Sequence, residues 1–519
     1  MLLNLFPLLA PLSFLTAALL YSRQPGRLTT QSMRIGEIAA LAALGISILC
    51  AILLFTSGPG QSVLLGVFGT GFQVKLDALS VTMLVLVSFV GWVVLRYSAT
   101  YLDGEERQGA FMGLMSGALA SVLFLVTAGT LFQLIAGWML AGAFLHRLLL
   151  FYPERPGAQR AARKKTLVSR AADASLIVAA ILLAIGYGTQ NIATILDAAR
   201  SGSVPAEALF ATGFLALAAI LKSAQLPLHG WLTEVMEAPT PVSALLHAGL
   251  INAGGFLIIR FADVMIQAPG ILAALALVGG LSALFGGLIM LTQSAVKTSL
   301  AWSTIAQMGF MILQCGLALF PFALLHIVAH SLYKAHAFLS SGTAVNAVTE
   351  AKKPGPVAIP NAAAVGKAFA LAIGIFLAIG FAFGFAGKSP QAIALGAILI
   401  FGVAYLIAQG LADAAPKDLT LRTLIYSLAA SVSYFALQTG ATFVMQGTVP
   451  PPPAPDNLEW AVIILAVVSF GGVALAQALL PLWSSHPTAA ALRVHIANGL
   501  YLNTAFDRLI GGWSKKQNA

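Results

Sequence analysis

Two residues that could do chemistry, with a proline between them, end a long apolar run, AILKSAQLPLHGW, at residues 219–231. Lys222 carries an amine that can gain or lose a proton, and His229 carries an imidazole that titrates near neutral pH. Pro227 lies between them, and because proline lacks a backbone donor and clashes with the preceding turn, it should break the helix just after Lys222. In transporters, broken helices expose carbonyl groups where an ion or a proton is handled. The stretch therefore predicts an ion-handling site.

A second group of titratable side chains occurs in HIVAHSLYKAHAF, residues 326–338. His326, His330 and Lys334 are spaced at i, i+4 and i+8, which places them on one face of a helix. Histidine can carry protons between lysines because its ordinary charge change falls near neutral pH. Chance rarely aligns three such groups on one buried face, so we interpret this face as a proton or cation relay.

Further ionisable residues at or near membrane depth are Asp173, His247, Lys297 and Lys388. Each costs about 2.5–3.5 kcal/mol to insert, so each is a functional hypothesis. Lys297 and Lys388 lie near the ends of their apolar runs, and a simpler interpretation is that they extend to the interface. The simpler interpretation of His229 is a cap on the broken helix, and that of His336 is an interhelical hydrogen bond.

The composition requires a membrane protein. The 519 residues are 59% hydrophobic and only 9% charged, with a mean hydropathy of +0.90, whereas about a quarter of the residues of a soluble domain are charged. Apolar runs of about 20 residues recur along the chain, each long enough to cross a bilayer. They lack the alternation of barrel strands, so they are helices. The predicted fold class is an all-α polytopic membrane protein with about 13–16 transmembrane helices.

We expect about fifteen spans. Basic loops follow the odd-numbered spans, as at Arg23 and Arg27 and at Lys352 and Lys353, which predicts a periplasmic N-terminus and a cytoplasmic C-terminus in a bacterial inner membrane. The first run lacks a basic flank and a cleavage site, so we interpret it as a retained span. The predicted spans are 2–20, 35–56, 77–97, 110–126, 128–150, 168–188, 207–231, 240–261, 270–292, 298–318, 320–345, 361–386, 389–410, 421–445 and 458–481.

Several classes of function are disfavoured. Cys50 and Cys315 both lie in apolar runs, which excludes a disulfide framework, a cysteine-ligated zinc site and an iron–sulfur cluster in this chain. The net charge of +10 gathers in loops and the tail, so it indicates membrane orientation and no nucleic-acid binding. No stretch between the spans is long enough for a catalytic domain. We therefore expect a transport subunit that is not itself an enzyme and holds no cofactor.

Three segments carry a family resemblance: KSAQLPLHGWLTEVMEAPTPVSALLHAG, VKTSLAWSTIAQMGFMIL and HSLYKAHAFLSSG. They resemble core motifs of the antiporter-like subunits of respiratory complex I (the L type) and of multisubunit cation/proton antiporters. The similarity runs from Lys75 to about Ser341. The resemblance implies two inverted five-helix repeats, each with a broken helix. The implied organisation is 1–109 N-terminal helices, 110–261 first repeat, 262–410 second repeat, 411–483 C-terminal helices and 484–519 a cytoplasmic amphipathic tail.

The resemblance also implies residue roles. Lys222 matches the lysine of the first broken helix, His247 the histidine of the following helix, and Lys297 a central lysine. Asp173 matches an aspartate near the first lysine. The connecting relay is implied at His326, His330 and Lys334.

The sequence departs from the respiratory relatives at two acidic positions. Met139 in AGWMLAG replaces a glutamate that pairs with the first lysine, which leaves Asp173 as the expected partner of Lys222. At the second broken helix, FAFGFAGKSP offers Lys388 and Pro390, but Ser389 stands where the family has an acid. The chain also ends soon after the fifteenth span, without the lateral helix of the respiratory subunit.

With these departures, the chain looks most like the membrane subunits of the two-component bacterial inorganic carbon transporter, the Dab type. That resemblance implies a large zinc-containing partner similar to a β-carbonic anhydrase on the cytoplasmic side, with zinc in the partner only. It also implies that proton or sodium flow powers CO2 hydration and bicarbonate accumulation. Two competing hypotheses are a proton-translocating subunit of a respiratory or antiporter complex and a passive membrane anchor for a soluble partner.

Overall fold

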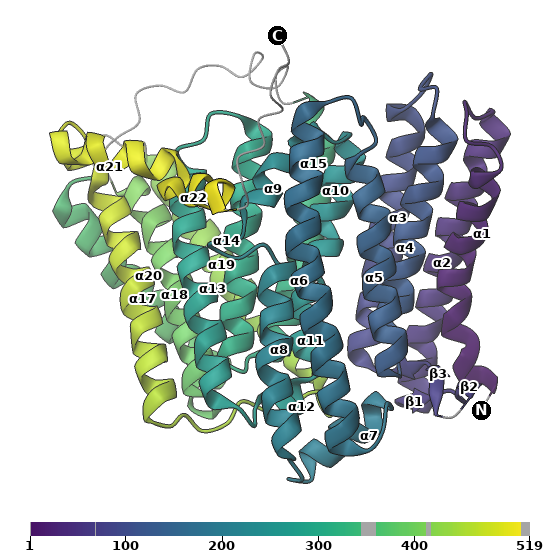
Figure 1. Cartoon of the computed structure of the whole chain (residues 1–519). Helices are drawn as coiled ribbons and strands as arrows, with labels where there is room; N and C mark the ends of the chain where they lie inside the picture. The colour runs from purple at the N-terminus through teal and green to yellow at the C-terminus, as the bar shows by residue number, and fades with distance from the viewer. Residues whose placement is uncertain (1, 68, 344–359, 412–416, 510–519) are drawn as a thin grey trace.

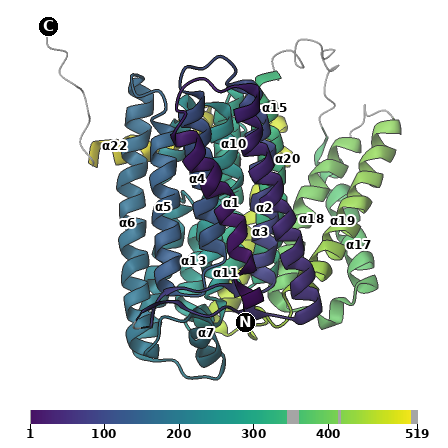
Figure 2. The ribbon, with the colours of Figure 1, turned by 90° about the vertical axis from the view of Figure 1, so that its right-hand side faces the viewer.

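The computed structural model describes residues 2–67, 69–343, 360–411 and 417–509. Long helices run side by side between two opposite faces (Figure 1). We call the face with the N-terminal segment, the short β-strands and helices α7 (Ile192–Arg200) and α12 (Ala262–Met265) the hairpin face. The opposite face carries α9 (Gly230–Glu234), α21 (Pro487–Ala497) and α22 (Leu502–Leu509), and we call it the tail face. The rotated view in Figure 2 shows the same two faces.

The first half of the bundle begins with a 3-10 turn, η1 (Leu2–Leu8), and long helices follow it. They are α1 (Leu9–Ser22), α2 (Thr30–Ser57), α3 (Ala78–Tyr101), α4 (Gln108–Val126), α5 (Leu131–Leu149) and α6 (Pro156–Tyr187). Between α2 and α3, two small antiparallel ladders cover the hairpin face. Strand β1 (Gly60–Gln61) pairs with β4 (Lys75–Leu76), and β2 (Leu65–Val67) pairs with β3 (Thr70–Phe72).

The first predicted broken helix is confirmed. Helix α8 (Ala206–Lys222) ends at the lysine, and the chain returns to helix only at α9, after the segment that contains Pro227. The next span is also interrupted, by a 3-10 turn between α10 (Thr240–Ala248) and α11 (Ala253–Arg260). Both interruptions leave backbone groups outside a helical ladder inside the bundle, which is tolerated where protein or a cavity surrounds them.

The second half contains α13 (Pro269–Met290), α14 (Val296–Gly316), α15 (Phe320–Ser340), α17 (Ala362–Ala382), α18 (Pro390–Gly410), α19 (Lys417–Met445) and α20 (Asn457–Trp483). The expected second broken helix is not confirmed. Helix α17 is continuous, and a turn with Gly384 at φ 73° joins it to α18, which packs against it. Lys388 and Pro390 therefore belong to a connection between two helices, because glycine in the left-handed conformation ends a helix.

Each of the predicted spans overlaps a helix of the described residues. Eleven of these helices are long and apolar enough to cross a membrane, judged by length and composition. The basic pair Lys352 and Lys353 and the predicted tail beyond residue 509 lie outside the described residues. The chain is thus a multi-span membrane protein, as its composition indicates.

A buried ion pair ties the start of α3 to the end of α11. Asp77 caps α3 through a capping box with Ser80, and its carboxylate also accepts hydrogen bonds from Arg260 at 2.5 and 3.3 Å. Both residues are only 3% exposed, and Lys75 lies 3.1 Å from the same carboxylate. The pair fixes the hairpin-face end of the interrupted α10–α11 span against α3.

We expect Asp77→Asn to destabilise the fold by about 3–5 kcal/mol, because it leaves the Arg260 charge buried without its counter-ion. Asparagine retains the side-chain oxygen of the helix cap, so the effect isolates the ion pair. The double variant Asp77→Asn/Arg260→Met should lose less than the sum of the two single losses, measured by thermal unfolding in detergent. Additive losses would show that the two residues act independently.

Candidate functional site

Lys222 is the last residue of α8, and its amine is buried beside the break. Among the described residues, its Nζ has no hydrogen-bond partner. The nitrogen lies 4.3 Å from the centroid of the Trp138 ring of α5, a contact that stabilises a cation. Lys222 also lines two small cavities, and in each of them the centre of a water molecule can move within a volume of about 20 Å³. That is enough for about one water, so the amine lies between two sites that a proton carrier could occupy.

The predicted link between Asp173 and Lys222 is indirect. Asp173 lies on α6, is 9% exposed, and accepts a hydrogen bond of 3.0 Å from Trp138 Nε1. No ion pair within 4.0 Å joins Asp173 to Lys222 among the residues that the structure describes. The carboxylate faces the lysine charge without touching it, and its hydrogen bond to Nε1 of Trp138 holds the indole ring over which the Lys222 amine lies.

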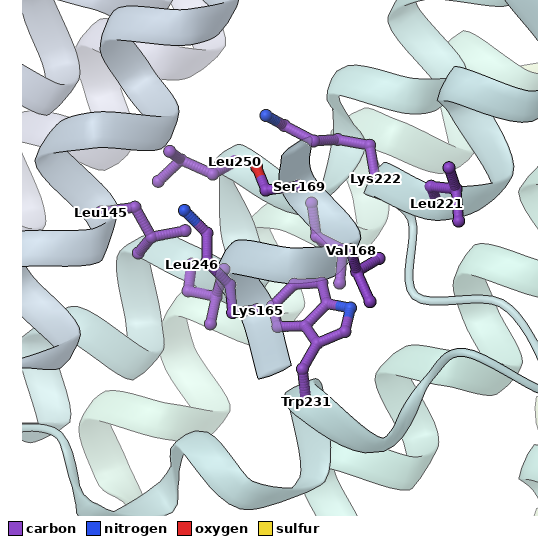
Figure 3. A pocket seen from close by; sticks show the side chains of 10 residues that line it. Leu145, Lys165, Val168, Ser169, Leu221, Lys222, Trp231, Leu246 and Leu250 are labelled. Atoms are coloured by element: carbon purple, nitrogen blue, oxygen red, sulfur yellow. The ribbon is translucent and has the colours of Figure 1, made fainter. Parts of the chain in front are cut away.

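Lys165 is a member of the site that the sequence did not predict. It lies on α6 with 5% exposure, and its Nζ donates a hydrogen bond of 2.7 Å to the carbonyl of Gly142 on α5. Figure 3 shows Lys165 and Lys222 with Ser169 around one of the two cavities. Hydropathy starts this span at residue 168 and assigns the lysine to a basic loop, but α6 already begins at Pro156.

His247 is fully buried in α10. Its Nδ1 forms a hydrogen bond of 2.9 Å with Thr304 of α14, and its ring stacks on Phe338 of α15 with centroids 4.3 Å apart. The Thr304 hydroxyl has a second partner, the carbonyl of Leu300 at 3.0 Å. If that hydroxyl donates to Leu300, Nδ1 of His247 is the donor to Thr304. Nε2 of His247, which lacks a partner among the described residues, can then accept a proton.

The predicted stripe on α15 joins His247 through hydrogen bonds. His330 Nε2 donates to the carbonyl of His247 at 3.1 Å, and the rings of His326 and His330 stack with centroids 6.1 Å apart. Lys334 is fully buried and donates to the Leu300 carbonyl at 3.0 Å, the same oxygen that Thr304 contacts. The structure thus brings α10, α14 and α15 together in one polar network. His336 is exposed and lies outside this network.

Two other predicted residues, Lys297 and Lys388, lie outside this polar network. Lys297 is half-buried at the tail-face end of α14 and donates to Thr240 at 3.2 Å. Lys388 lies in the hairpin-face turn and donates to Gln438 at 3.1 Å. Within the described part of the chain, no hydrogen bond joins either lysine to His247, His330 or Lys334. Both positions are near helix ends, as the interpretation of interfacial lysines requires.

His229 follows the break and is fully buried, with its ring 4.8 Å from that of Trp302 on α14. It makes no capping hydrogen bond at the start of α9, and neither ring nitrogen has a partner among the described residues. His229 is therefore not a simple cap on the broken helix. No cluster of three or more histidine, cysteine or acidic side chains suited to a metal occurs in the described ranges.

The arrangement can move protons in steps. Lys222 and its two cavities form one station, and the cavity on the Trp138 side reaches Gly249, two residues after His247. The network of His247, His330 and Lys334 forms a second station. Hydrogen-bonded groups that can each accept and release a proton provide such steps.

Comparison with known proteins shows the family to which the chain belongs. The model described as NADH:quinone oxidoreductase/Mrp antiporter, TM, matches residues 128–355, and that of the NADH-ubiquinone oxidoreductase (complex I) chain 5 N-terminus matches residues 64–112. Probable inorganic carbon transporter subunit DabB2 of Halothiobacillus neapolitanus is 35% identical over 519 residues, covering 98% of this chain and 93% of that relative. The chain belongs to the Dab inorganic carbon transporter subunit family. The family lies within the antiporter-like superfamily.

Other relatives place this Dab-family subunit in the superfamily. NADH-quinone oxidoreductase subunit L of Escherichia coli is 36% identical over 283 residues, covering 54% of this chain and 46% of that subunit. Among solved structures, a chain of the Mrp complex from Dietzia sp. is similar with a TM-score of 0.66 and 25% identity, over 98% of this chain and 59% of that chain. These similarities support a cation-coupled membrane subunit.

A charged clasp closes the tail face of this Dab-family subunit over the broken helix. Lys164 of α6 is 2% exposed and pairs with both Glu234 of α9 and Asp507 of α22. Asn503 of α22 accepts from Lys164 at 3.2 Å and donates to Glu234 at 2.9 Å. A Cβ on Gly230 would lie 1.8 Å from the Asn503 side-chain oxygen, so α22 approaches α9 closely because that residue is glycine.

We expect Lys164→Met to release α22 from α9, because Glu234 and Asp507 would then face each other without their shared cation. Tryptic cleavage at the exposed Arg508 should become several-fold faster, since proteolysis follows the population of the detached segment. The control is Arg493→Met, an exposed basic residue of α21 that forms no ion pair within the described ranges, which should leave the rate unchanged. Equal rates in parent and Lys164→Met would refute the clasp.

Proposed function

We propose that this chain is the proton- or sodium-conducting membrane subunit of an energy-coupled inorganic carbon transporter. The cation gradient powers CO2 hydration and bicarbonate accumulation by a zinc-containing partner subunit. The observation that carries the proposal is the buried network around His247, His330 and Lys334, in a chain similar over almost its whole length to an inorganic carbon transporter subunit. A buried row of titratable groups is costly in a membrane and is explained by ion transfer.

The tail face is the cytoplasmic side in this proposal. Its connections and helix ends are rich in basic residues, such as Arg23, Arg27, Arg155 and Arg160. The loops of the hairpin face carry few, and Arg200 there is paired with Asp263. Positive residues concentrate in cytoplasmic loops of bacterial membrane proteins. The partner subunit then docks on the tail face, where CO2 hydration retains its product in the cytoplasm.

Two competing functions are less well supported. The complex I relative from Escherichia coli matches only 54% of this chain, whereas the carbon transporter relative matches 98%. The Mrp antiporter chain also covers 98% of this chain, but it is 25% identical, against 35% for the carbon transporter relative. A passive anchor gives no reason for buried lysines and histidines at membrane depth. The anchor hypothesis requires that variants of the network retain full transport.

To test the proposal, the subunit is expressed together with its partner in a host that lacks its own carbon uptake systems. Labelled inorganic carbon uptake is measured with and without agents that collapse the proton or sodium gradient. We expect uptake and growth in air to depend on both proteins and to stop when the driving gradient is removed. Growth and uptake that persist without either gradient would overturn the proposal.

A further inference from the structure

We propose that Lys165 is a second proton-exchanging residue of the ion pathway, which shares one proton with Lys222 in the cavity between α5, α6 and α8. This inference rests on the proposed function and deepens it, because it names the group that connects Lys222 to the tail face.

The two amines occupy one small space. A Cβ placed on Gly142 would lie 3.8 Å from Lys222 Nζ, 4.0 Å from Lys165 Nζ and 3.7 Å from the Ser169 hydroxyl. In Figure 3 both amines point to the same side of the cavity, with the Ser169 hydroxyl between them in this view. Most of the other residues that line this cavity are apolar, among them Leu145, Val168 and Leu246. The three polar groups therefore form one cluster around the unsubstituted Cα of Gly142.

The surroundings favour one positive charge on this pair. Two ammonium groups in an apolar cavity repel each other strongly because little solvent screens them. No carboxylate lies within 4.0 Å of either amine in the described part of the chain, and the nearby Asp173 is hydrogen-bonded to Trp138, so neither amine has a counter-ion in contact. The Trp138 face stabilises a cation at Lys222, whereas the bond from Lys165 to the Gly142 carbonyl can be donated by a neutral amine. The pair thus holds a single exchangeable proton.

The exchange is a simple proton transfer. An N–H bond of the Lys222 ammonium breaks while an N–H bond forms at the neutral Lys165 amine, directly or through one water, and the charge of the cavity stays the same. Transfer in this direction moves the positive charge from the Trp138 face to the α6 side. The reverse transfer reloads Lys222 for delivery toward the His247 network.

Lys165 lies on the route to the tail face. Its chain neighbour Lys164 is held in the clasp by Glu234 of α9 and Asp507 of α22. The other titratable or charged groups around Lys165 are Lys222 of α8, Asp173 and Arg170 of α6, and His146 of α5, which is bonded to Thr166. From α10 and the following turn, only leucine and isoleucine line the cavity. Lys165 is thus one residue away along α6 from the tail-face clasp, and in this proposal it is the group through which Lys222 exchanges protons with that face.

The test compares Lys165→Met, Lys165→Arg and Lys222→Met in the two-protein transporter. Carbon uptake is measured in cells, and assembly is measured by co-purification of the partner. We expect Lys165→Met to lower uptake by about a hundredfold with assembly intact, since positioned proton-transfer groups contribute at least that factor. Arginine keeps the charge but does not release its proton, so Lys165→Arg should be equally inactive. Full uptake in Lys165→Arg would overturn the inference, because a merely structural positive charge would then suffice.

Gly142→Ala tests the same space without changing a charge. Its methyl group fits at ordinary contact distances and fills the space next to both amines that a bridging water would occupy, so we expect at least about a tenfold loss of uptake. The matched control is Gly287→Ala in α13, where an added Cβ has no atom within 4 Å, and uptake should be unchanged. If Lys222→Met is inactive while Lys165→Met and Gly142→Ala transport normally, this inference fails alone. If Lys222→Met also transports normally, the proposed function fails.

Discussion

Lys222→Met should assemble with its partner and yet lose at least about a hundredfold in inorganic carbon uptake, the lower end of the contribution of a positioned proton carrier. Methionine has a similar length and retains the packing on Trp138, but it cannot hold a proton. The break after α8 does not depend on this side chain, because Pro227 follows it. The expected effect is therefore on transport, measured as labelled uptake and as growth in air, and not on folding.

The matched control for this variant is Lys388→Met. Lys388 is also a half-buried lysine of the bundle, but it lies in the hairpin-face turn and bonds to Gln438, away from the cavities around Lys222. We expect its uptake to stay within about twofold of the parent, as for a residue outside the transfer path. Loss of uptake in Lys388→Met with full activity in Lys222→Met would reverse the assignment of the two residues.

His330→Phe should also abolish uptake, again by about a hundredfold. His330 is 4% exposed, donates to the carbonyl of His247, and stacks near His326, so it connects α10 to the stripe of α15. Phenylalanine preserves an aromatic ring of similar shape and removes both nitrogens. Because the His247 carbonyl lies beside the interruption between α10 and α11, a modest loss of thermal stability should accompany the change, about 1–3 kcal/mol for one buried unsatisfied acceptor.

The control here is His336→Phe, one of the remaining histidines of the same helix, which is exposed and has no place in the polar network. It should transport and unfold like the parent. Normal uptake in His330→Phe, together with inactivity of Lys222→Met, would mean that protons leave Lys222 by a path that avoids α15. The network of His247, His330 and Lys334 would then serve to hold α10 and α15 together and would have no part in proton transfer.

The elements that hold the site follow from local sequence. Uniform apolar runs predict the helices, because a backbone in lipid must satisfy its hydrogen bonds within each segment. Pro227 predicts the break after Lys222, since the loss of a donor acts on the neighbouring turn alone. The spacing of His326, His330 and Lys334 predicts a shared face because helical periodicity is equally local, and the structure buries most of that face.

Other predictions fail where the deciding interaction is not local. The segment FAFGFAGKSP predicts a broken helix. In the structure, Gly384 lies in the turn after α17, and Pro390 is the first residue of α18, which packs against α17. Hydropathy starts α6 at residue 168, because the charges before it resemble those of a loop. In the structure Lys164 and Lys165 are buried by partners from α5, α9 and α22, which hydropathy does not reveal.

By itself, the sequence determined that this chain is a polytopic helical membrane protein with a broken helix at Lys222 and a polar stripe on a later helix. Only the tertiary structure decided which groups touch. It put Trp138 between Lys222 and Asp173, joined Lys334 to His247 through Leu300 and Thr304, and brought Lys165 to the cavity of Lys222. Helical periodicity and hydropathy act over a few residues, whereas the contacts between different helices join residues 34 or more positions apart, so packing alone fixes them.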